Sequence, residues 1–311
     1  MYATERYYKH SGVIGIVGPV LMLVFGLLAA GILGAIYGYP IYYIPLISVN
    51  FFVTLFFGFG VGFMVGAGAK IGQVRHGGIV ALFGLFAGLF ALYVGWVSWL
   101  HALLGPDDAV VAPGQVMSFI QAIAVEGVWE MFGHTPSGFS LYAIWSIEAL
   151  MIVGLAVVGA WAAVGSKPFC ESCKKWVDAT HEISPLAPIG DTQTMKQSLE
   201  ATRYDDLMAL GFIDDGSTAF SKVTLMQCGG CRAKQYLTLQ AVTVKVDSDK
   251  SKSEDETDVV ENLILSEGDY EKLLGHWSKV EAEQAKSSVD DATRATRRLH
   301  DKSSIGAVCS N

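Results

Sequence analysis

Charged side chains are nearly absent from the first half of this chain. Of the 52 charged residues (22 basic and 30 acidic), only ten lie before position 165. This scarcity excludes an ordinary soluble domain there, because soluble domains are about 25% charged. The later half holds the other charges, with a net charge of −6. Composition therefore divides the chain into an apolar half and a charged, mildly acidic half.

Strongly polar residues rarely interrupt the first half, which contains four long apolar runs. They cover residues 12–38, 46–69, 78–103 and 139–164. Each is long enough to cross a bilayer, which takes about 20 helical residues. The first run also exceeds the apolar core of a signal peptide, which has about 7–15 residues. We predict an α-helical membrane domain of four transmembrane helices over residues 1–165, with Pro19 kinking the first helix.

Basic residues are missing from one set of connections between these runs. Segment 104–138 has four acidic residues and neither Lys nor Arg. The basic residues cluster at the opposite ends of the runs, at Arg6, Lys9, Lys70, Arg75, Lys167, Lys174 and Lys175. The positive-inside rule predicts a multi-pass protein of the cell membrane, the inner membrane in a bacterium, with both termini in the cytoplasm. Apolar residues at helical spacing in the 104–138 loop predict an interfacial helix on the outer side.

The glycine-rich stretch GFGVGFMVGAGAKIG, residues 58–72, lacks the order of a phosphate-binding loop. Neither G-x-G-x-x-G nor G-x-x-x-x-G-K-[ST] occurs in it, so nucleotide binding is disfavoured. Glycines instead recur every four residues in two of the apolar runs, at Gly58, Gly62, Gly66, Gly84 and Gly88. Such small-residue spacing predicts faces on which membrane helices pack closely.

Three polar side chains interrupt the later apolar runs: Asn50, His101 and Glu148. Ionisable groups inside a membrane are costly and are therefore functional candidates. One interpretation is a polar cavity open to the outside, with Glu148 protonatable and His101 as its partner. The other is structural: Glu148 and His101 form one interhelical hydrogen bond, or His101 lies among the lipid headgroups.

Only five cysteines occur, and four of them form two C-x-x-C pairs, Cys170 with Cys173 and Cys228 with Cys231. Four thiolates match the tetrahedral, sulfur-rich coordination of structural Zn²⁺. Disulfides are disfavoured by the cytoplasmic placement, and a thioredoxin-like centre would have one such pair in a βαβ unit. We therefore predict a structural zinc ion bound by these four cysteines.

Residues 220–227 and 235–246 flank the second cysteine pair and have the composition of β-strands. A cysteine pair between two strands resembles a zinc ribbon, and the resemblance covers about 168–246, with the four paired cysteines at the ligand positions. It implies a small fold used for protein or nucleic-acid contacts without catalysis. The long segment between the pairs departs from a minimal ribbon, and we expect a helix near 192–210. The predicted cytoplasmic domain, 166–246, is thus α+β and zinc-ribbon-like.

The sequence after residue 246 predicts three separate segments. Residues 247–258, DSDKSKSEDETD, contain no apolar side chain and predict a charged linker. A short strand followed by a helical segment is expected over 259–300, and a disordered tail over 301–311.

Two features of composition limit the possible functions. The net charge of −6 in the later half disfavours nucleic-acid binding, which needs a basic surface. The sequence has no recognisable nucleophile–base pair and no cofactor fingerprint, so we do not expect an enzyme.

The favoured hypothesis is a membrane anchor or scaffold that presents a cytoplasmic zinc domain to a protein partner, to a second copy of itself or to a signal. The alternative is a small channel or transporter that uses Glu148, His101 and Asn50, with the zinc domain as its regulatory module.

Overall fold

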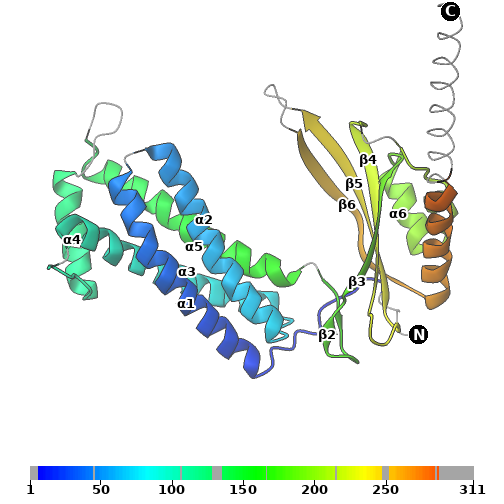
Figure 1. Ribbon diagram of the computed structural model, residues 1–311, viewed down its shortest axis with the longest axis horizontal. Helices are drawn as coiled ribbons and strands as arrows, with labels where there is room; N and C mark the ends of the chain where they lie inside the picture. The colour runs from blue at the N-terminus through cyan, green and yellow to red at the C-terminus, as the bar shows by residue number, and fades with distance from the viewer. Residues whose placement is uncertain are drawn as a thin grey trace, which may run out of the picture. The chain divides into compact units, whose positions relative to one another are not determined.

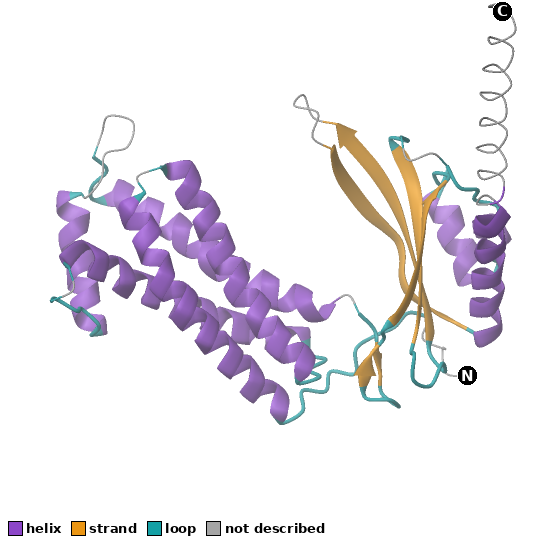
Figure 2. Ribbon diagram, in the orientation of Figure 1, coloured by secondary structure: helices purple, strands orange, loops and turns teal. Residues whose placement is uncertain are grey.

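A computed structural model describes residues 6–44, 46–105, 107–127, 135–165, 167–213, 216–246, 252–283 and 286. The chain forms two compact units. The helix unit is His10–Phe169, and the sheet unit combines Met1–Lys9 with Cys170–Asn311. Figure 2 shows the contrast between them, long helices in the first and a twisted sheet in the second.

The helix unit contains four long helices that run side by side (Figure 1). They are α1 (Val17–Tyr43), α2 (Ile47–Ile71), α3 (Gly77–Leu104) and α5 (Phe139–Gly165). All four are long and apolar enough to cross a membrane, which confirms the predicted number of such helices. Large apolar side chains cover their outer surface; Phe56, for example, is 75% exposed and Leu150 is 72% exposed. A helix that is apolar all round needs an apolar environment on its outer side.

The first helix begins five residues later than the predicted 12–38. Gly12 and Gly15 precede it with φ of 73° and 67°, in the left-handed region that a helix cannot include. This later start places Pro19 in the first turn, where the missing N–H has no helical acceptor. The predicted kink at Pro19 is therefore wrong, and the proline inside the helix is Pro40, in the last turn.

A shorter helix, α4 (Pro113–Glu126), lies within the 104–138 loop and contacts α3 and α5. Val116, Ile123 and Ala124 are buried against the longer helices, while Met117 on another face is 55% exposed. The helix is thus present where an interfacial helix was expected.

Glycines allow the long helices of this unit to approach closely. A Cβ atom at Gly58 would lie 2.7 Å from the carbonyl oxygen of Ile152 in α5, and one at Gly62 would collide with the Ala156 carbonyl. From the other side, a Cβ at Gly84 would lie 2.8 Å from the same Ala156 oxygen. Gly66 and Gly88 also face α5. A Cβ at Gly66 would meet Ala163, and a Cβ at Gly88 would meet Val153. The five glycines singled out in the sequence therefore all lie at contacts with α5.

The sheet unit is built on a four-stranded antiparallel sheet in the order β3-β4-β5-β6. The strands are β3 (Ala179–Leu186), β4 (Ala219–Gln227), β5 (Gln235–Val246) and β6 (Lys252–Leu265). Alternating residues of the strands point to a buried face, as expected for a sheet covered on one side. Two further short strands, β1 (Phe169–Cys170) and β2 (Lys175–Trp176), pair with each other ahead of the sheet.

One face of the sheet is covered by α6 (Thr192–Glu200), α7 (Asp205–Met208) and a helix over 267–283 (Figure 1). The single helix expected near 192–210 is thus two helices separated by a turn. The core beneath them is apolar and includes Leu199, Leu207, Leu225, Leu237, Leu239, Tyr270, Leu273 and Trp277. Asp191 begins α6 by accepting hydrogen bonds from the backbone N–H groups of Gln193 and Thr194, at 3.0 and 3.3 Å.

The predicted linker over 247–258 is wrong for the part that the structure describes, because residues 252–258 belong to β6. Their charges face solvent or a neighbouring strand: Gln240 on β5 donates to Glu256 and Asp258 at 3.1 and 3.0 Å. Lys222 on β4 lies 3.6 Å from Glu256. The segments predicted as separate pieces, 166–246 and 259–300, therefore share one sheet. The predicted tail, 301–311, lies outside the described residues.

The N-terminal segment extends this sheet, although the prediction grouped it with the apolar helices. Tyr7 forms an antiparallel bridge with Leu263 at the outer edge of β6. The Tyr8 N–H donates to the Asn262 carbonyl at 2.9 Å, and the Tyr7 hydroxyl donates to Glu200 at 2.6 Å. Residues from both ends of the chain thus belong to the same sheet unit.

Candidate metal centre

Two tight turns present the four paired cysteines. Cys170 ends β1 and Cys173 lies in the turn that leads to β2. Cys228 and Cys231 lie in the turn between β4 and β5. Lys174 and Arg232 follow the second cysteine of each pair with φ of 49° and 53°, left-handed backbone that turns the chain back sharply.

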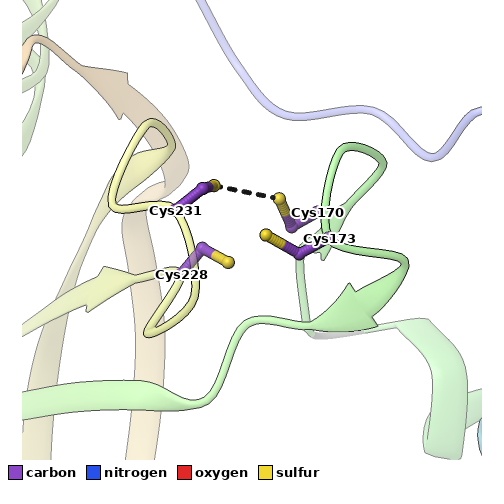
Figure 3. Close-up of side chains that lie close together, drawn as sticks. All are labelled: Cys170, Cys173, Cys228 and Cys231. Carbon is purple, nitrogen blue, oxygen red and sulfur yellow. Dashed lines mark hydrogen bonds between the residues drawn. The ribbon is translucent and has the colours of Figure 1, made fainter.

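The two turns face each other, and their four sulfur atoms point into one space (Figure 3). All four Sγ atoms lie within 4.8 Å of one another, and those of Cys170 and Cys231 are 3.5 Å apart. The cysteines are free thiols; Cys170 and Cys228 are buried, Cys173 is half-buried and Cys231 is exposed. In a tetrahedral site with metal–sulfur bonds of about 2.3 Å, neighbouring sulfurs are about 3.8 Å apart. The observed separations fit this arrangement, so the four cysteines can hold a metal ion.

A carboxylate outside the cluster ties the two turns together. Asp178 accepts a hydrogen bond from the Gly229 backbone N–H at 2.9 Å, and its other oxygen lies 2.9 Å from Lys175 Nζ. Lys175 begins β2, directly after the first turn, and Gly229 lies in the second turn. The Lys175 ammonium and the Gly229 N–H hold the pKa of Asp178 below its usual value, because both stabilise the ionised carboxylate.

The thiols differ in how easily they ionise. Burial raises the pKa of Cys228, but hydrogen bonds from the Cys231 and Gly230 N–H groups and from Cys170 and Cys173 lower it to about 7. The hydrogen bond with Cys231 is the main cause that raises the pKa of Cys173 to about 12. Closely spaced thiols influence one another's ionisation, and Cys228 is the one whose pKa its neighbours lower. Metals bind thiolates, so this arrangement favours binding.

Apolar side chains lie beside the cysteine turns. Val177, Met226 and Tyr236 are buried together, and the ring of Tyr8 packs edge-on against that of Tyr236, with centroids 5.5 Å apart. Val177 follows the first turn, whereas Met226 and Tyr236 flank the second. The N-terminal segment therefore contributes to the packing around this site.

The intramembrane candidates fall into two places in the helix unit. Tyr37 on α1 donates a hydrogen bond to Glu148 on α5, and its hydroxyl is also 2.9 Å from Thr54 on α2. Thr54 in turn donates to the Asn50 carbonyl at 2.8 Å. His101 lies elsewhere, beside a separate cavity of about 230 Å³ that Tyr39 and Ser98 also line. The structure therefore does not bring His101 to Glu148, and Asn50 joins this network only through its backbone.

Sequence reasoning missed Asp178, Lys175 and Tyr37. Tyr37 is closely followed by Tyr39, Tyr42 and Tyr43, so the sequence does not single it out as a hydrogen-bonding partner of Glu148. Nothing near Asp178 in the sequence indicates that it reaches Gly229, because the two residues are 51 positions apart.

Comparison with known proteins adds no relationship at this point. No protein-family model, no curated protein sequence and no solved structure matches this chain.

Proposed function

We propose that this protein is a membrane-anchored scaffold whose sheet unit is a cytoplasmic, zinc-dependent interaction or sensing domain. The observation that carries the proposal is the four sulfur atoms within 4.8 Å of one another. Sulfur ligands in a tetrahedral arrangement suit zinc, or iron as the competing metal. Four thiolates fill the coordination shell and leave no position for a substrate, which supports a scaffolding role rather than catalysis.

The four apolar helices support the anchoring part of the proposal. They have the length and the apolar outer surface that a bilayer requires. The pairing of Tyr7 with Leu263 supports it further, because it joins a segment before α1 to a segment after α5, and the two would then lie on the same side of a membrane that the helices cross. An even number of crossings, as four helices provide, satisfies this requirement.

Two features favour the cytoplasm as that side. The basic residues before α1, between α2 and α3, and after α5 follow the positive-inside rule. The free thiols of the four-cysteine cluster also suit a reducing compartment.

Metal analysis of the purified full-length protein tests the zinc assignment. We expect about one zinc per chain, lost when Cys228 is replaced by Ser and retained when Cys309, which lies outside the cluster in sequence, is replaced by Ser. Iron in place of zinc would contradict the metal assignment. The absence of bound metal, with all four cysteines freely alkylated, would contradict the proposed zinc domain itself.

Crosslinking and pull-down from native membranes test the scaffold role. We expect a reproducible cytoplasmic partner, or a second copy of the chain, that is lost when residues 168–300 are deleted. Loss of the same contact in the zinc-free Cys228→Ser protein would identify the metal-bound domain as the binding surface. A partner that survives both changes would contradict the role assigned to this domain.

A channel or transporter is the second candidate, and the link of Glu148 through Tyr37 to Thr54 favours it. A carboxyl group inside a predicted membrane segment is costly and often marks an ion or proton pathway. Flux measurements in proteoliposomes with the wild type and with Glu148→Gln test this candidate. Absence of flux in both, or equal flux in both, would contradict it.

A further inference from the structure

Three helices of the helix unit place aromatic rings around the carboxyl group of Glu148. Glu148 and Trp145 are three residues apart on α5 and share a face of that helix. Trp96 and Trp99 have the same spacing on α3, and Tyr37 comes from α1. These five side chains line one cavity of about 40 Å³, which has room for about three water-sized groups.

The tryptophans are held in fixed positions within the cluster. The rings of Trp96 and Trp145 meet edge to face with centroids 5.0 Å apart, and those of Trp96 and Trp99 at 5.7 Å. Trp99 is 7% exposed, whereas Trp161, on the outer surface of α5, is 54% exposed. A tryptophan that only anchors a helix at the membrane interface would face outward, as Trp161 does. The Trp99 side chain instead packs inward beside the cavity.

Tyr37 is fixed from two sides. Its ring stacks on that of Phe57, with centroids 4.4 Å apart and 20° between the planes. Gly95 also lies against the ring, because a Cβ atom at Gly95 would be 3.1 Å from it. The hydroxyl therefore points steadily at Glu148 and Thr54.

The cavity contains an acidic side chain, Glu148, but no basic side chain among the described residues lines it. Within the described part of the chain, Glu148 accepts a hydrogen bond from Tyr37, and no Lys, Arg or His forms an ion pair with it. A carboxylate in such a site gains most from a cation that enters the cavity. Mg²⁺ and Ca²⁺ need at least about six oxygen ligands, more than these side chains supply. Ammonium-type cations need fewer, because they are also attracted to the faces of tryptophan rings.

We propose that this aromatic cavity is a binding site for a small monovalent ammonium-type cation, such as a primary amine. Glu148 supplies the negative charge, and Trp96, Trp99 and Trp145 surround the alkylammonium group. All the residues involved lie within about 14 Å of the helix ends next to the 104–138 segment, at 1.5 Å per residue. The ligand therefore enters from that side of the helix unit.

This inference adds a ligand class to the channel or transporter candidate, but it does not depend on transport. Equilibrium binding is measured without flux, so the binding site and the transport candidate can fail separately. Neither depends on the zinc site.

The test uses full-length protein in lipid nanodiscs. Methylammonium chloride replaces sodium chloride at constant ionic strength, and binding is followed by tryptophan fluorescence and by titration calorimetry. We expect a saturable signal in the wild type, weakened at least about tenfold in Glu148→Gln and in Trp145→Leu. The matched control, Trp161→Leu, removes an outward-facing tryptophan from the same helix and should leave the affinity unchanged.

Several results would overturn the proposal. These are the absence of a saturable response to methylammonium in the wild type, an unchanged affinity in Glu148→Gln, or equal losses in Trp145→Leu and Trp161→Leu. Each variant is first checked for the melting temperature of the wild type. If Glu148→Gln does not fold, the comparison of the two tryptophan variants decides the question.

Discussion

At the scale of single residues, Asp178 has a clear role in positioning the two cysteine pairs, although no sequence motif indicates it. One of its oxygens accepts a hydrogen bond from the Gly229 N–H in the second cysteine turn, and the other from the Lys175 ammonium just after the first turn, both at 2.9 Å. The contact joins residues on the two sides of the cluster and so fixes the distance between the two cysteine pairs. Residues that orient metal ligands in this way commonly change metal affinity by about 10–100-fold when they are replaced.

We therefore expect Asp178→Ala to weaken zinc binding about 10–100-fold without abolishing it, because all four thiols remain. Asp178→Asn should weaken binding less, since an amide oxygen still accepts the Gly229 hydrogen bond. Competition with a chromophoric chelator measures both affinities. Asp205→Ala is the control, as that carboxylate only forms an exposed ion pair with Lys272 at 3.7 Å. Equal zinc affinity in Asp178→Ala and the wild type would contradict the positioning role.

At the scale of elements, α5 organises the helix unit because two glycine-bearing helices approach it at the same residue. Gly62 of α2 and Gly84 of α3 both lie against the Ala156 carbonyl. The neighbour at these contacts is backbone, which cannot rotate out of the way as a side chain can. Close approach of this kind replaces the hydrophobic effect as the force that holds helices together in lipid.

Gly62→Leu should therefore destabilise the helix unit by at least about 3 kcal/mol, the upper end of the usual range for overpacking. Gly154→Leu is the matched control, since a Cβ there meets nothing within 4 Å. Its expected effect is within about 0.5 kcal/mol. Reversible unfolding in mixed detergent micelles gives both values. Similar losses in the two variants would show that close packing at Gly62 is not what the helices require.

The elements that could be predicted are those whose own residues show a clear pattern of hydropathy or spacing. The four long helices follow from length and hydropathy, and the four-cysteine cluster follows from the two C-x-x-C spacings. The strand over 252–258 was missed because its charged residues find partners elsewhere in the sheet, such as Gln240 on β5 and Lys222 on β4. Those partners become apparent only once the register of the sheet is known. The Tyr37–Glu148 contact likewise joins helices that are far apart in sequence.

At the scale of the whole molecule, the pairing of the N-terminal segment with β6 constrains the topology. The sheet unit contains residues from before α1 and from after α5, so helices that cross a membrane would have to return the chain to the side from which it started. Four crossings meet this condition and three or five do not. Under the positive-inside rule, the basic residues support our proposal that this common side is the cytoplasm.

Reporter fusions in a bacterial host test this arrangement. Green fluorescent protein should fluoresce, and alkaline phosphatase should stay inactive, when fused at either terminus. Phosphatase inserted after Asp108, in the acidic segment between α3 and α4, should be active. Phosphatase activity at one terminus and not at the other would contradict the common side, and activity at both would contradict the cytoplasmic assignment.

The bridge between Tyr7 and Leu263 also sets an order of events during synthesis. Tyr7 leaves the ribosome about 250 residues before its partner, which at about 5–20 residues per second is a wait of about 13–50 s. All four long helices are translated in that interval. If one helix failed to insert, the early segment and its late partner would be stranded on opposite sides of the bilayer. In a protein whose four helices cross a membrane, the pairing of Tyr7 with Leu263 would therefore form only after all four had inserted.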